Sequence, residues 1–113
     1  MTSINIAPAY GTFLTRAVVN FTATGDNVVV AAVASQIIQV YRIFFVVSAA
    51  TTITFKDGAG TNQTGAIPLA ANGAITLDNS GDPWFVTSAG NAFIINQSGT
   101  AQTSGAVWYT QRA

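Results

Sequence analysis

Residues 37–58 read IIQVYRIFFVVSAATTITFKDG, and this stretch decides the fold class. It holds two runs rich in β-branched and aromatic residues, at 37–48 and 52–57, which are the residue types that fit a pleated sheet. In the second run, apolar and polar residues alternate as in a half-buried strand. Asp57 and Gly58 then supply turn chemistry, because glycine adopts positive φ at no steric cost. The stretch therefore predicts two consecutive β-strands.

The predicted strand at 37–48 is apolar on both faces. Strict alternation divides its side chains into two opposite sets: Ile37, Gln39, Tyr41, Ile43, Phe45 and Val47, and Ile38, Val40, Arg42, Phe44 and Val46. A strand of this kind is expected to be covered on both sides. One set can lie in the domain core, so the other needs a second layer or a neighbouring subunit. The apolar run from Val28 to Val33 makes the same demand.

The rest of the chain repeats this pattern. Val, Ile and Thr together make up 36 of the 113 residues, whereas Leu occurs three times. Period-two runs bounded by turn residues predict further strands. The expected strands cover residues 16–23, 27–33, 37–48, 52–57, 65–70, 73–78, 92–97 and 105–111. In the first of them, one face is expected in the core: Ala17, Val19, Phe21 and Ala23. Pro68 lacks a ladder donor, which predicts an edge strand or a bulge.

About eight short strands in one chain predict an all-β fold, an antiparallel two-layer β-sandwich. The cysteine framework of antibody domains is absent because the chain has no Cys, so we favour a jelly-roll. The first residues mix Pro8 and Gly11 with scattered apolar side chains. We therefore expect an N-terminal arm over residues 1–15 and a β-sandwich domain over residues 16–113.

The composition argues against an enzyme. The chain has no His, Cys or Glu, so the usual bases for Ser or Thr nucleophiles and the usual transition-metal ligands are missing. Asp78 and Asp82 lie close together and resemble a carboxylate pair or a Ca²⁺ loop. However, the segment between them reads as a surface loop, and Pro83 interrupts the calcium pattern. We predict no catalytic residues, no metal, no cofactor and no small-molecule substrate.

Charge excludes other partners. The four cationic and four acidic side chains cancel to zero net charge, which disfavours nucleic acid, where affinity comes largely from phosphate neutralisation. The longest apolar run, Val28 to Ala34, is far shorter than the roughly 20 residues of a spanning helix. We therefore expect no membrane partner. A surface with so few charges promotes association, so we predict a homo-oligomer.

Three segments resemble small structural proteins of tailed bacteriophages. They are the segment from Ser48 to Gly58, the segment Ile67-Pro68-Leu69 with Asn72-Gly73, and the pair Trp84-Phe85. The chain is similar in these places to capsid decoration (cement) proteins, over roughly residues 26–112. The resemblance implies a jelly-roll fold like that of tumour necrosis factor and a homotrimer on the capsid surface of the virion. It also implies the major capsid protein as a partner, whose subunit contacts the trimer stabilises.

The resemblance and the association argument give the expected sites. We predict a subunit interface on the strand at 37–48 and the last strand: Tyr41, Phe44, Phe45, Val46, Val47, Trp108 and Tyr109. Which face of the strand forms the interface is left open; if Phe45 belongs to it, Phe45→Glu yields monomers. A capsid contact is predicted for the N-terminal arm through Ile4, Ile6, Tyr10 and Phe13.

A second reading is kept open. The chain could be a recognition module of a phage tail tip or fibre that binds host glycans, or an accessory domain of a hydrolase. This reading predicts ring-stacking residues at an exposed rim, with Trp84 and Asp82 as the first candidates. Exposed aromatic side chains also anchor protein interfaces, so Trp84 alone does not decide between the two.

Overall fold

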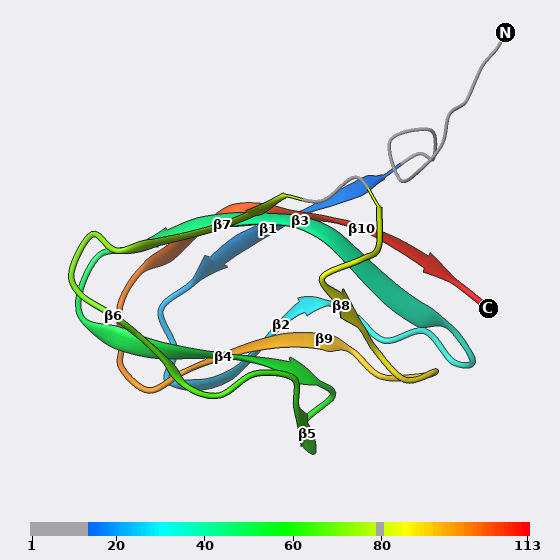
Figure 1. Cartoon of the computed structure of the whole chain (residues 1–113). Coiled ribbons are helices and arrows are strands. Elements are labelled where there is room, and N and C mark those ends of the chain that lie inside the picture. The colour runs from blue at the N-terminus through cyan, green and yellow to red at the C-terminus, as the bar shows by residue number, and fades with distance from the viewer. Residues whose placement is uncertain (1–13, 79–80) are drawn as a thin grey trace, which may run out of the picture.

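A computed structural model describes residues 14–78 and 81–113 (Figure 1). Within these ranges the chain forms strands and no helix. The strands are β1 (Thr15–Phe21), β2 (Gly25–Val30), β3 (Ile37–Val47), β4 (Thr51–Asp57), β5 (Thr61–Asn62), β6 (Ile67–Leu69), β7 (Ala74–Asp78), β8 (Phe85–Val86), β9 (Phe93–Gln97) and β10 (Thr103–Arg112).

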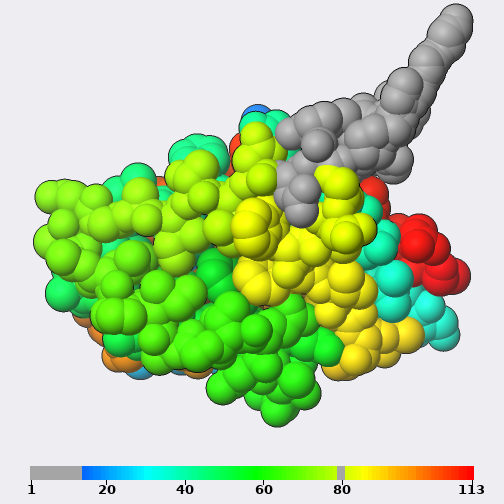
Figure 2. All heavy atoms as spheres, viewed as in Figure 1, coloured from blue at the N-terminus to red at the C-terminus, as the bar shows by residue number. Residues whose placement is uncertain are grey.

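The strands form two five-stranded antiparallel sheets packed face to face. Sheet A has the order β1-β10-β3-β7, with β8 also on β3, and sheet B has the order β2-β9-β4-β5, with β6 also on β4. Figure 1 shows sheet A as the upper layer and sheet B as the lower one. In Figure 2 the chain from β5 to β8, coloured green to yellow, makes up most of the side that faces the viewer.

The pairing is nested, as in a jelly roll. The first strand pairs with the last, β2 with β9, β3 with β7, and β4 with β6. Two further pairs join these strand pairs within the sheets, since β10 also pairs with β3 and β9 with β4. The predicted antiparallel β-sandwich and its jelly-roll topology are thus confirmed. Pro68 lies in β6 at the edge of sheet B, as its missing N–H predicts.

The core lies between the sheets and consists almost wholly of β-branched and aromatic side chains. Four phenylalanine rings form its centre: Phe55 packs on Phe45, Phe85 and Phe93 with ring centroids 6.2, 4.7 and 6.1 Å apart. Branched side chains from both sheets surround them: Val19, Val30, Ile38, Val40, Ile43, Val47, Ile53, Ile95 and Val107.

A β-bulge in β3 changes which side chains of this strand face the core. In the pairing with β10, Trp108 lies opposite Arg42 and Tyr109 opposite Val40, so Tyr41 is the extra residue. An extra residue breaks strict alternation. Ile38 and Val40 before the bulge, and Ile43, Phe45 and Val47 after it, therefore all point inward and are buried. The predicted division of this strand into two apolar faces is wrong.

The close pairing of β10 with β3 depends on Gly105. This glycine faces Phe45 across the two strands. A Cβ placed on Gly105 would lie 2.6 Å from the Cα of Phe45 and would also meet the Phe44 carbonyl. Only a residue without a side chain fits there, so Gly105 sets the spacing of the two central strands of sheet A.

Hydrogen bonds of a buried amide close one end of the sandwich. The Gln97 side chain is fully buried. Its Nε2 donates to the carbonyls of Ala101 and Ala23, at 3.0 and 3.2 Å, and its Oε1 accepts from Thr51 Oγ1 at 3.3 Å. The amide thereby joins the loops before β2 and β10 to β4 and β9. These bonds satisfy buried polar groups that would be costly to leave unpaired.

A buried carboxylate holds the loop between β8 and β9. Asp57 ends β4, and its carboxylate accepts bonds from the Ser88 N–H at 3.0 Å, the Ser88 hydroxyl at 2.9 Å and Asn91 Nδ2 at 3.0 Å. Gly58 follows with a φ of 64°, the left-handed conformation that its place in a tight turn predicts. Asp57 is thus a structural residue of the described chain.

Two strands end earlier than the sequence predicts. The first ends at Phe21, so Ala23 is exposed and does not belong to the core. The second ends at Val30, and the residues from Ala31 to Val33 are an exposed segment outside the sheet. The apolar run at 28–33 therefore does not form a strand covered on both faces.

Candidate interaction surface

The outer face of sheet A carries a continuous apolar surface. β1, β10, β3 and β7 bring Val18, Ala106, Phe44 and Thr76 into one row across the sheet. The next row holds Asn20, Ser104, Val46 and Ala74. Val18 is 66% exposed, Phe44 46% and Val46 42%. We name Val18, Phe44, Val46 and Trp108 the apolar face; Ala106, which lies between Val18 and Phe44, is buried.

A third row adds charge and an indole ring at the edge of the apolar face. It runs Arg16, Trp108, Arg42, Asp78 across the same four strands. The Trp108 ring stacks on Phe44 with centroids 6.2 Å apart. The Arg42 guanidinium carbon lies 5.1 Å from the centre of the Trp108 ring, within the range of a cation–π contact.

Arg42 is fixed from a second side. Its Nε lies 3.0 Å from Asp78 Oδ1, and both side chains are about half exposed. An ion pair so exposed adds little stability, about 0–1 kcal/mol. Its effect is positional, since it holds the guanidinium against Trp108. Trp, Arg and Phe in one preorganised cluster match the composition of interface hot spots, in which Trp and Arg are enriched.

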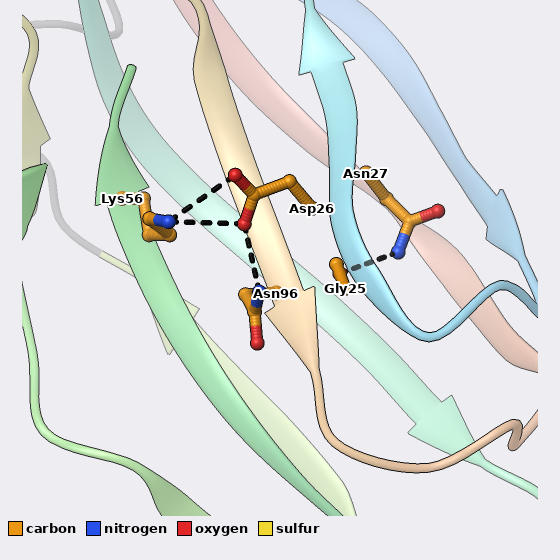
Figure 3. A network of polar contacts seen from close by, with 5 residues as sticks. All are labelled: Gly25, Asp26, Asn27, Lys56 and Asn96. Carbon is orange, nitrogen blue, oxygen red and sulfur yellow. Dashed lines mark hydrogen bonds and ion pairs between the residues drawn. The ribbon is translucent and has the colours of Figure 1, made fainter. Parts of the chain in front are cut away.

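The outer face of sheet B has a polar network at its centre, with Val28 exposed on its edge strand. In this network the Lys56 ammonium lies 3.0 and 3.2 Å from the two Asp26 carboxylate oxygens, and Asn96 Nδ2 donates to Asp26 Oδ1 at 2.7 Å (Figure 3). The Asn96 hydrogen bond, with the Lys56 charge beside it, holds the pKa of Asp26 below its ordinary value of 3.8. Thr52 and Thr54 continue this face along β4.

The structure separates the predicted interface residues into two groups. Phe44, Val46 and Trp108 lie together on the apolar face, and Tyr41 is the half-buried residue of the neighbouring bulge.

The other predicted interface residues point the opposite way. Phe45 and Val47 are 0% exposed in the core, so they present no surface to another subunit and their assignment is wrong. Tyr109 is half-buried and packs against the core, on the opposite side of β10 from Trp108, and its place in an interface stays a prediction. The prediction failed on β3 because the bulge at Tyr41 places Phe45 and Val47 on the core side of the strand.

Two residues of this surface were missed by the sequence reasoning. Val18 and Arg16 lie on β1, and both point outward. The signal for Val18 was present, because an apolar residue stood among Asn20 and Thr22 on the predicted solvent face. Arg16 gave no signal. Its position beside Trp108 follows from the pairing of the first strand with the last.

The aromatic residues of the segment 84–85 separate as well. Phe85 packs against the core, whereas Trp84 is 45% exposed. The Trp84 N–H donates to the Val40 carbonyl at 2.8 Å, which fixes its backbone beside β3. Val86 follows on the outer side of sheet A, opposite Gln39.

Other predicted features carry no site in the described part of the chain. Over residues 14–78 and 81–113, no group of three or more His, Cys, Asp or Glu side chains could hold a metal ion. Within the same residues, no helix is long and apolar enough to cross a membrane. The arm residues Ile4, Ile6, Tyr10 and Phe13 lie outside the described residues, so their capsid contact stays a prediction.

Searches of protein-family models, curated proteins and solved structures found no match to this chain. The functional argument therefore depends on the surface itself.

Proposed function

We propose that this protein is a structural protein of a virion: a homotrimeric decoration protein that binds the capsid surface and stabilises the contacts between capsid subunits. The observation that carries the proposal is the apolar face. Exposed Val18, Phe44 and Val46 lie beside the stacked Trp108 on one sheet of a rigid sandwich. Contiguous exposed apolar patches on small soluble proteins mark sites of interaction with other chains.

The architecture supports a structural role. Four nested strand pairs and two closing pairs join residues far apart in the chain. Buried Gln97 and Asp57 fix loops at their positions. A protein that reinforces a shell needs this rigidity and a complementary surface, and it needs no catalytic group. Repetition around a shell multiplies the effect of each weak contact through avidity.

The proposed trimer is supported by the small number of charges, four cationic and four acidic. Like charges on neighbouring subunits oppose close assembly, and a chain near zero net charge associates readily. Decoration proteins, which the segments at 48–58 and 67–73 resemble, assemble in this way on the capsid.

Glycan recognition at a phage tail is the second candidate, and one observation favours it. Trp84 presents a half-exposed indole at a fixed backbone position, which is the arrangement of a sugar-stacking platform. A glycan array separates the two candidates. Sugar binding that Trp84→Ala abolishes supports tail recognition, whereas no sugar binding supports the decoration role.

The decoration role is tested by sedimentation. The full chain is examined by sedimentation equilibrium, and its binding to undecorated capsid shells of the encoding bacteriophage is measured by co-sedimentation. We expect a trimer that pellets with the shells and raises the temperature at which they open. A stable monomer at micromolar concentration, or a trimer that stays in the supernatant, would contradict the proposal.

A further inference from the structure

The positive charges of the chain gather on one surface. Three of the four cationic side chains, Arg16, Arg42 and Arg112, project from strands of sheet A on its outer side. Of the carboxylates described on strands of that sheet, Asp78 stands opposite Arg42. In the row next to the apolar face, Arg16 and Arg42 stand against Asp78, which leaves one positive charge in excess there.

Arg16 is exposed, and among the described residues its side chain forms neither an ion pair nor a hydrogen bond. Arg42 is paired with Asp78, and Arg112 donates to Gln39 Oε1 at 3.3 Å. Arg16 stands next to Trp108 in the row that Arg42 and Asp78 complete. A guanidinium beside a partly exposed indole gives an arrangement that binds a carboxylate with two parallel hydrogen bonds.

Each acidic side chain of this chain already has a partner within the chain. Asp26 is bound by Lys56 and Asn96, Asp57 by Ser88 and Asn91, and Asp78 by Arg42. Asp82 has an interaction as well. Residues 1–13 contain no charged side chain. A second copy would therefore have to give up one of these contacts to offer a carboxylate to Arg16, and residues 1–13 have none to offer.

We propose that the outer face of sheet A docks a different protein chain, which lays apolar side chains on Val18, Phe44 and Val46 and presents a carboxylate to Arg16. The identification of that chain as the capsid shell rests on the proposed function. The assignment also moves the predicted interface residues Phe44, Val46 and Trp108 from the contact between copies to the contact with the partner, and leaves the trimer contact to another surface.

The neighbours of Trp108 favour a protein over a sugar. A sugar site surrounds its stacking ring with polar groups that bind hydroxyls. Here Arg16 and Arg42 flank the ring across the strands, but along the sheet it is followed by Phe44 and Val46, which offer no side-chain hydrogen bond. Burial of such side chains against apolar side chains of a partner makes the favourable contribution to the free energy of binding. Arg16 then fixes the register and orientation of the bound chain.

A selection from a random-sequence peptide library on the immobilised full chain tests the proposal. We expect enriched peptides that combine apolar residues with Asp or Glu. They should bind Arg16→Gln and Phe44→Ala at least about tenfold more weakly than the wild type. Val28→Glu is the matched control, since it lowers the net charge by one as Arg16→Gln does, but on sheet B. Circular dichroism confirms that each variant is folded.

Several results would overturn the proposal. These are enriched peptides without carboxylates, equal binding to Arg16→Gln, no enrichment at all, or binding of acidic oligosaccharides that Phe44→Ala abolishes. A synthetic peptide of residues 1–13 that displaces the selected peptides would assign the surface to this chain. Loss of self-association in both variants, measured by sedimentation equilibrium, would assign it to a second copy. The selection uses no capsid, so its outcome and that of shell binding are independent.

Discussion

The centres of the two outer faces differ in chemistry although both sheets belong to one sandwich. On sheet B, Asp26, Lys56 and Asn96 satisfy one another at distances of 2.7–3.2 Å. On sheet A, the exposed positions of the central strand β3 hold Phe44 and Val46. A face with internally satisfied polar groups gains little by contact with another chain, whereas an apolar face does. The difference indicates which side of the molecule is built to be covered.

The largest expected effect is on stability, and it distinguishes the core side of sheet A from its outer side. Phe45 is fully buried and Phe44 is half exposed. We expect Phe45→Ala to lower the free energy of unfolding by about 3–5 kcal/mol, because it removes a core ring and leaves a cavity. Phe44→Ala should lower it by only about 0.5–1.5 kcal/mol, because the half-exposed ring loses mainly its stacking on Trp108. Urea unfolding measures both. Equal losses would mean that the bulge at Tyr41 is misplaced.

The next effect compares the two outer faces directly. Val18 on sheet A and Val28 on sheet B lie on edge strands and are 66% and 62% exposed. Val18→Glu places a carboxylate in the proposed contact beside Arg16, where it removes apolar surface and competes for the guanidinium, and we expect at least about tenfold weaker binding to capsid shells. Val28→Glu should bind like the wild type. Co-sedimentation over a concentration series gives both affinities, and similar losses in the two variants would remove the distinction between the faces.

The smallest effect concerns the polar face alone. The pKa of Asp26 is lowered in the folded protein, so its ionised form is favoured by folding. The resulting stabilisation is fully present above pH 3.8, the ordinary pKa of this side chain. It is lost as the pH falls through the lower pKa of Asp26 in the folded state. For a partly exposed pair it amounts to about 0.2–1 kcal/mol. Asp26→Asn should therefore reduce the loss of stability on acidification.

Urea unfolding at neutral pH and below 3.8 measures this difference for the wild type and the variant. Asn96→Ala serves as a second variant, because it removes the hydrogen bond that contributes most to the lowered pKa of Asp26. If acidification destabilises all three proteins equally, the network does not act on Asp26 in the folded state.

The sequence was sufficient for the fold because its signals are local. Gly58 directly follows one alternating strand and Gly73 directly precedes another. The turn residues and the alternation of apolar side chains that define a strand all lie within or next to it. The eight predicted strands all occur, and β5 and β8, of two residues each, are too short for a period to be seen.

The surface could be predicted only in part, because it depends on register between distant strands. The bulge at Tyr41 is defined by the opposite strand β10, so nothing near residue 41 shows that Phe45 turns inward and Phe44 outward. Likewise, Arg16 meets Trp108 because residues 92 positions apart in the chain pair. The sequence predicted Phe44, Val46 and Trp108 as interface residues, because apolar side chains on a strand are expected to be covered. It did not predict their neighbours on β1, Arg16 and Val18.

Hydroxyl-radical footprinting of the protein, free in solution and within purified virions, tests most directly whether other chains cover the outer face of sheet A. The account predicts that oxidation of Phe44, Val46 and Trp108 falls strongly on assembly, while that of Val28 on sheet B changes little. Unchanged oxidation of Trp108 and Phe44 in the assembled protein, or absence of the protein from virions, would contradict it.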